Sequence, residues 1–392
     1  LQKRPIHSFQ RPDSKYQKLD TNATSLNGWA GRITFNKQEG EFYFNAALGA
    51  ISPGFNSNDL GFSWRTNYIN GHILGGYRDY KEDSWSRSKS IYAGYFRSYN
   101  FDGDKEADGI FTTGNLWMKN FHRLRFNFGV NFEAYSTRHT RGGPTVKLPA
   151  SYNGAIGFST DQRKDITVDG DFYYSGDDLG GNYYSIQLGG SWRASEAVRL
   201  TIYPGYEWNY DPGQWIANQD DPTATNTYGT RHIFGFLDQK TLFATIRLDY
   251  TFTPTMSLQL FAQPFISIGK YSNIKEFAKE RTSDFTVYGT KGTTINYDSN
   301  NEEYVINPGN GGNPFAIGNP DFNFKSLRLN IIYRWEFLPG STLFLVWSHD
   351  RTNFDNPGEF QMGKSFSNLM NSEANNIFMV KMTYWFNAAG LL

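Results

Sequence analysis

Four acidic side chains alternate within one short segment and could supply oxygen ligands to a cation. Asp102, Asp104, Glu106 and Asp108 lie directly before Gly109. Oxygen-rich loops of this kind suit Ca²⁺, a hard cation. The spacing departs from the EF-hand, because Ala107 stands where that loop has its invariant glycine and the last ligand position has no glutamate. Weak calcium binding is one hypothesis for this segment, and a solvated acidic loop tip is the other.

One contiguous trio has the residue types of a catalytic relay. Ser348, His349 and Asp350 follow one another directly. Neighbouring residues of a strand point to opposite faces, so these three converge only if they lie in a turn. The other histidines lack the spacing of a metal-binding pair: His7, His72, His122, His139 and His232. The sequence therefore predicts no catalytic residues and no enzyme.

The segments that must position these residues alternate between apolar and polar side chains. Leu124, Phe126, Phe128, Val130 and Phe132 alternate with polar residues that begin at Arg123 and Arg125. Residues 198–209 and 327–336 repeat the pattern, with Ile332 as an apolar exception. Such a period of two predicts strands with one apolar and one polar face.

The length of these segments favours a membrane barrel over a soluble β-sandwich or propeller. Soluble strands are usually shorter, and nothing favours aromatic residues at the ends of their apolar rows. Here the apolar rows close on Tyr206 and Trp208, on Tyr333 and Trp335, and on Tyr384 and Phe386. Aromatic girdles of this kind lie at membrane interfaces. We predict an all-β fold: a transmembrane antiparallel up-and-down β-barrel in the bacterial outer membrane.

Composition restricts the alternatives. Aromatic residues make up 17% of the 392-residue chain, and cysteine is absent, which fits an oxidising envelope. No apolar run approaches the length of a membrane helix, which excludes a helical membrane protein. Lys plus Arg equals Asp plus Glu at 38 each, so there is no excess of basic charge to attract nucleic acid.

The alternating segments predict about fourteen to sixteen strands. They lie near residues 29–36, 41–50, 64–78, 89–100, 109–119, 123–136, 152–160, 166–175, 183–193, 198–209, 231–237, 242–250, 256–269, 326–336, 342–348 and 377–386. We expect residues 1–26 to be an N-terminal extension or link and residues 387–392 a C-terminal tail, around a barrel at 27–386. Large outer loops are predicted at 210–230, 270–325 and 349–376.

Strict alternation of short turns and long loops makes residues 231–250 a single strand. The total is then odd, and the first strand starts on the outer side. Two explanations stay open. Either strands upstream of Leu1 complete the barrel, or residues 64–89 hide a hairpin.

Several motifs in one order resemble a known family. They are Ser52-Pro53-Gly54-Phe55, Asn58-Asp59-Leu60-Gly61-Phe62, Thr140-Arg141-Gly142-Gly143-Pro144, Leu237-Asp238-Gln239-Lys240-Thr241 and Tyr333-Arg334-Trp335-Glu336. The chain, from about residue 24 to 386, resembles the Bacteroidota outer-membrane barrels that carry an amino-terminal family-nine carbohydrate-binding module. The resemblance implies a C-terminal barrel part. It implies no activity, because that family is largely of unknown function.

Loop residues offer candidate ligand contacts. Arg141 could bind a carboxylate or a sugar, although the Gly-Gly-Pro that follows also suits a loop folded onto the barrel rim. Tyr288, Tyr297 and Tyr304 could stack on sugar rings or pack locally.

The polar faces predict a charged inner wall. If the apolar faces meet lipid, the lumen is lined by Arg123, Arg125, Glu133, Asp169, Asp171, Arg199, Glu207, Arg247, Asp249, Arg328, Arg334 and Glu336. A wall with both signs of charge suits a porin-like conduit for small solutes or saccharides. The alternative is a non-catalytic subunit of a larger outer-membrane complex with protein partners, and an outer-membrane hydrolase is the third hypothesis.

Overall fold

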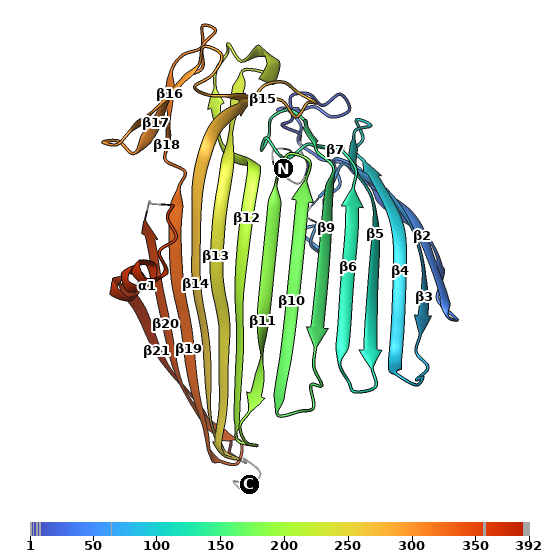
Figure 1. Ribbon diagram of the computed structural model, residues 1–392, viewed down its shortest axis with the longest axis vertical. Helices are drawn as coiled ribbons and strands as arrows, with labels where there is room; N and C mark the ends of the chain where they lie inside the picture. The colour runs from blue at the N-terminus through green and yellow to red at the C-terminus, as the bar shows by residue number, and fades with distance from the viewer. Residues whose placement is uncertain are drawn as a thin grey trace.

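A computed structural model describes residues 2, 4, 7, 9–63, 65–355 and 358–386 of the protein. Its main feature is a sixteen-stranded antiparallel sheet in the order β1-β2-β3-β4-β5-β6-β9-β10-β11-β12-β13-β14-β19-β20-β21, with β15 paired to β14 (Figure 1). The sheet is curved, and β1 and β21 are its two edges. The predicted all-β antiparallel architecture is confirmed.

The strands of the sheet follow the alternating segments of the sequence. Their bounds are β1 Ala30–Lys37, β2 Phe42–Ile51, β3 Tyr68–Asp79, β4 Ser86–Tyr99, β5 Lys105–Met118, β6 Arg123–Asn131, β9 Ser151–Ser159, β10 Ile166–Asp177, β11 Asn182–Arg193, β12 Val198–Asp220, β13 Thr230–Thr253, β14 Met256–Phe277, β15 Phe285–Val287, β19 Phe322–Leu338, β20 Ser341–Asp355 and β21 Ala374–Thr383.

The remaining elements lie in connections between these strands. They are the hairpin β7 Ala134–Ser136 and β8 Val146–Leu148, the three-stranded sheet β16 Thr294–Asp298, β17 Glu303–Asn307 and β18 Phe315–Gly318, the 3-10 turn η1 Thr225–Thr227, and the helix α1 Met362–Asn371. No helix in the described residues is long and apolar enough to cross a membrane.

Short turns lie at one end of the sheet and most of the longer connections at the other (Figure 1). Consecutive strands on the main path are antiparallel, so β1 and β21, the first and last of an odd number, run in the same direction. Both run from the long-loop end toward the short-turn end, as predicted for the first strand. In the described residues β1 and β21 are not paired with each other, so the expected closed barrel is not observed.

The single strand over residues 231–250, which strict alternation of turns and loops predicted, is confirmed as part of β13. Other predicted boundaries were wrong, since residues 123–136 divide into β6 and β7. The predicted loops at 210–230 and 270–325 contain the outer ends of β12, β13 and β14. In these ends both faces are covered, since the neighbours Ile233 and Phe234 are both fully buried. The apolar/polar alternation that marks a half-exposed strand is therefore absent.

The outer ends of these three strands form an extension beyond the rest of the sheet. β12 pairs with β11 only as far as Tyr210, and β14 pairs with β19 only between Met256 and Gly269. Residues 211–220, 230–237 and 271–277 therefore pair only among themselves and with β15. Ile233 and Ile274 in this extension pack against Tyr288, Ile306 and Ile317 of the 270–325 segment. That segment thus folds as a structured cap at the long-loop end.

The predicted loop at 349–376 is also partly ordered structure. β20 continues to Asp355, and α1 follows before β21 begins at Ala374. The additional hairpin considered for residues 64–89 is not present in the described part of this segment, because β3 is followed directly by β4. Trp64 lies outside the described residues. The predicted tail at 387–392 also lies outside them.

Candidate functional site

One face of the sheet is apolar and exposed. The register aligns Phe126, Ile156, Phe172, Ile186 and Tyr206 across five neighbouring strands. Ile156 and Ile186 each expose 52% of their surface. Further large apolar side chains continue this face along the sheet: Ile33, Phe35, Leu48, Ile73, Ile91, Ile110, Leu124, Phe128, Val130, Leu188, Trp192, Ile202, Trp335, Leu345, Phe378 and Val380.

Aromatic rings form a row across this apolar face near its long-loop end. The ring centroids of Tyr152 and Tyr174 are 5.8 Å apart, those of Tyr174 and Tyr184 are 4.7 Å apart, and those of Tyr184 and Trp208 are 5.7 Å apart. The row spans β9 to β12. It places amphipathic rings at a common level, as at a membrane–water interface.

The opposite face is polar and carries both signs of charge. Arg125 Nη2 lies 3.0 Å from Asp171 Oδ1, although β9 separates the two strands. The residue between them is Gly157, where a Cβ would lie 2.3 Å from the Asp171 carboxylate and 2.9 Å from the Arg125 guanidinium. Glycine therefore leaves room for the two charged groups to meet across a strand.

Other charged groups on this face are also paired. Arg328 Nε lies 3.3 Å from Asp350 Oδ1, and Arg334 Nη2 lies 2.8 Å from Glu336 Oε2. The Tyr203 hydroxyl donates to Asp169 over 2.8 Å.

The register places eleven of the twelve predicted lumen residues on this polar face: Arg123, Arg125, Asp169, Asp171, Arg199, Glu207, Arg247, Asp249, Arg328, Arg334 and Glu336. Glu133 is the exception. It lies between β6 and β7, and its carboxylate pairs with Lys147 of β8 at 2.8 Å.

Hollows lie along the polar face. One, of about 480 Å³, is lined by Phe243, Phe265 and Phe324, with Glu207 and Arg328 also in its wall. Another, of about 360 Å³, includes Tyr92, Asn127, Arg125 and Asp171. These hollows combine aromatic surface with charge on a face that is otherwise open.

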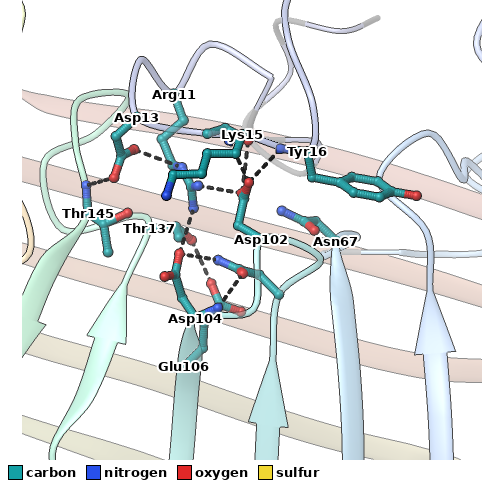
Figure 2. A network of polar contacts seen from close by, with 12 residues as sticks. Arg11, Asp13, Lys15, Tyr16, Asn67, Asp102, Asp104, Glu106, Thr137 and Thr145 are labelled. Carbon is teal, nitrogen blue, oxygen red and sulfur yellow. Dashed lines mark hydrogen bonds and ion pairs between the residues drawn. The ribbon is translucent and has the colours of Figure 1, made fainter.

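A buried ionic network joins the N-terminal segment to the rim of the sheet (Figure 2). Asp102 accepts hydrogen bonds from the backbone amides of Lys15 at 2.6 Å and Tyr16 at 2.7 Å, and from Arg11 Nη2 at 2.5 Å. Arg11 Nε also lies 3.0 Å from Asp13 Oδ1, and Asp13 Oδ2 accepts from the Thr145 amide at 3.1 Å. The Arg11 side chain and both of these carboxylates are almost fully buried.

The other three carboxylates of the predicted calcium segment have different partners. Asp104 pairs with Arg281 and accepts from Asn100 Nδ2 at 3.0 Å. Glu106 pairs with Arg65 and accepts from Thr137 Oγ1 at 2.8 Å. Asp108 lies 2.8 Å from Arg97 Nη2 and 3.0 Å from Lys105 Nζ. In the part of the chain that the structure describes, no three acidic or histidine side chains are grouped as a metal site. The geometry thus gives the calcium hypothesis no support.

The loop that contains Arg141 is folded onto the extension of the sheet. The Arg141 guanidinium lies 3.9 Å from the ring centroid of Trp215, and Asn218 Nδ2 donates to the Thr140 carbonyl at 3.2 Å. A Cβ at Gly143 would lie 2.1 Å from the His232 ring, so glycine is needed for this close approach. This arrangement matches the rim-packing alternative for residues 140–144.

The three loop tyrosines lie in different environments. Tyr288 is buried in the cap, and its hydroxyl donates to Glu276 Oε2 at 3.0 Å. Tyr297 and Tyr304 pair across β16 and β17 with ring centroids 5.0 Å apart. Tyr297 remains 47% exposed. Local packing thus accounts for Tyr288, and Tyr297 keeps an accessible ring.

Ser348, His349 and Asp350 do not converge. Ser348 Oγ donates to Asn330 Oδ1 at 2.7 Å, and Asp350 pairs with Arg328 on the polar face. His349 lies on the opposite face beside Trp347, and its Nδ1 is 2.8 Å from Asn376 Oδ1. The trio therefore makes no relay.

The family comparison adds one finding. Residues 7–390 match the model of a family described as a domain of unknown function, DUF5916. The chain belongs to this family. A comparison with curated proteins gave no match. The family model thus covers nearly the whole chain, and its description names no function.

Replacing Asp102 with Asn should release the N-terminal segment of this DUF5916 chain. The change leaves the buried Arg11 with less compensating charge and weakens two amide hydrogen bonds, at a cost of about 3 kcal/mol. Hydrogen exchange at Lys15 and Tyr16 should become about a hundredfold faster.

Asp83 supplies the matched control, because its carboxylate also accepts from two backbone amides, Trp85 and Ser86, but at the short-turn end. Asp83→Asn should leave exchange at Lys15 and Tyr16 unchanged. Equal exchange rates in the wild type and in Asp102→Asn would show that the network does not hold the segment.

Acidic pH should loosen the loop at residues 137–145. Burial lowers the pKa of His232 to about 4 and also lowers the pKa of His139. When the loop leaves, both rings meet water and their pKa values rise toward about 6.5. Protonation therefore favours the undocked loop, and the docking free energy falls as pH drops from about 6.5 toward 4.

Hydrogen-exchange mass spectrometry of residues 137–145, corrected for the intrinsic pH dependence of exchange, measures this change. The double variant His139→Asn/His232→Asn should show a flatter pH profile than the wild type. Loop protection that stays constant from pH 7 to pH 4.5 in the wild type would contradict the argument.

Proposed function

We propose that this DUF5916 chain is an integral outer-membrane protein that forms most of the wall of a β-barrel conduit for small hydrophilic solutes. One observation carries the proposal. Outside the extension of β12, β13 and β14, the sheet presents exposed apolar side chains on one face and paired charges on the other. In water, each large apolar side chain left exposed forgoes about 2 kcal/mol of burial energy. Lipid against the apolar face removes that cost.

The row of aromatic rings supports the same orientation. Tyr152, Tyr174, Tyr184 and Trp208 lie at one level of the apolar face. Tyrosine and tryptophan concentrate where hydrocarbon meets lipid headgroups. The long connections and the N-terminal segment lie at this end of the sheet, which we assign to the outer side of the membrane (Figure 1).

The two free edges require a partner. Among the described residues each edge strand pairs with a neighbour on one side alone, and unpaired main-chain groups are costly in lipid. Because β1 and β21 run in the same direction, antiparallel closure takes an odd number of additional membrane-spanning strands. Such strands agree with the sequence-based expectation of further barrel sequence, and with the resemblance to Bacteroidota barrels that carry a carbohydrate-binding module.

A second function, a structural subunit of a larger outer-membrane complex, is favoured by the same free edges and by the cap on β14 and β19. In that case the polar face is filled by a partner and carries no current. Conductance separates the two proposals.

Arg328 is the residue of choice for testing the conduit. Its side chain is 69% exposed on the polar face, so Arg328→Glu adds negative charge to the proposed lumen. Full-length protein, extracted from the membrane in which it is made, should give single-channel currents in planar bilayers. The reversal potential in a salt gradient should shift toward higher cation permeability in the variant.

Lys240 provides the matched control. It lies on the apolar face opposite Trp208, so Lys240→Glu should leave the reversal potential unchanged. Absence of current, or an equal shift in both variants, would overturn the conduit and favour the structural subunit.

A further inference from the structure

A third hollow on the polar face has a chemistry of its own. It measures about 430 Å³ and lies beside the β10–β11 turn, where the extension of β12 begins. Its wall includes Asn153, Tyr173, Asp177, Tyr183, Asn209 and Asp211. This volume is within the usual range for small-molecule sites.

The polar side chains of this hollow have hydrogen-bonding capacity to spare. One oxygen of Asp211 accepts from the Gly213 amide at 2.7 Å, and the other accepts from no donor among the described residues. The amides of Asn153 and Asn209 form no side-chain hydrogen bond within that same part of the structure. These groups can both donate to and accept from a ligand hydroxyl.

Aromatic surface lies next to these groups. The rings of Tyr173 and Tyr183 are 5.7 Å apart at an angle of 63°. Ring faces of this kind pack against the apolar C–H surface of a ligand. The hollow therefore offers hydrogen-bonding groups and an apolar platform to the same molecule.

Charge selects among ligands. None of the described residues that line the hollow is Lys or Arg. His139 at its edge stacks on Phe234 with ring centroids 5.1 Å apart, and burial lowers the pKa of His139, so it is neutral near pH 7. Phosphate or carboxylate ligands would face Asp177 and Asp211, and no Lys or Arg among the described lining residues would bind them. A neutral ligand avoids that repulsion.

We propose that this hollow binds a neutral saccharide. A sugar ring combines many hydroxyl groups with an apolar C–H face, which matches the amides, carboxylates and tyrosine rings of the wall. The inference rests on the proposed function, because the polar face must be in contact with water for a sugar to reach it.

Isothermal titration calorimetry of the full-length protein in detergent, with maltotetraose as probe, tests the site. Tyr173→Ala should weaken binding about tenfold or more, because it removes half of the aromatic platform. Asn209→Ala should weaken binding as well. The control is Tyr92→Ala, a tyrosine on the same face that lines a different hollow, which should bind as the wild type does.

An anionic probe tests the role of charge. Tetragalacturonate should bind more weakly than maltotetraose, because its carboxylates would face Asp177 and Asp211. No saturable binding of maltotetraose, or tighter binding of tetragalacturonate, would overturn the proposal. Conductance of the same preparation distinguishes failure of the saccharide site from failure of the conduit. Current without sugar binding overturns only the saccharide site. Sugar binding without current overturns only the conduit.

Discussion

The pleat of an extended chain sends successive side chains to opposite faces, and every other feature of this molecule depends on that division. Along β6, the apolar residues Leu124, Phe126 and Phe128 lie on one face, and Arg123 and Arg125 on the other. Antiparallel pairing carries the division from strand to strand. A one-residue slip in any register would put arginine among the apolar rows and leucine among the charged ones.

The sheet also leaves two requirements unmet, and both point to surroundings other than bulk water. The apolar face needs an apolar solvent, and the edge strands β1 and β21 need partners for their main-chain groups. In the proposed orientation, lipid covers the apolar face and additional strands pair with the two edges. At the rim, by contrast, the protein pairs its own buried charges, since Arg11 forms an ion pair with Asp13 and another with Asp102 (Figure 2).

Sequence patterns predicted the half-exposed strands well and the covered ones poorly. The alternation around Phe126 or Ile202 reports a strand with two different environments, and eleven of the twelve predicted lumen residues lie on one face. The alternation disappears at Ile233 and Phe234, where both sides are buried. The rim network could not be predicted from the sequence either, because no local pattern relates Asp104 to Arg281, which lies 177 residues away in sequence. The hollow beside the β10–β11 turn was missed for the same reason, since its residues come from several strands.

The central claim is that one face meets lipid and the other meets water. The 392 residues contain no cysteine, so single cysteines at Ala155 and Ile156, neighbours on opposite faces of β9, can be compared directly. A membrane-impermeant maleimide applied to the protein in its native membrane should label Ala155→Cys and leave Ile156→Cys unlabelled until the protein is denatured. Equal labelling of the two, or labelling of Ile156→Cys alone, would contradict the proposed orientation.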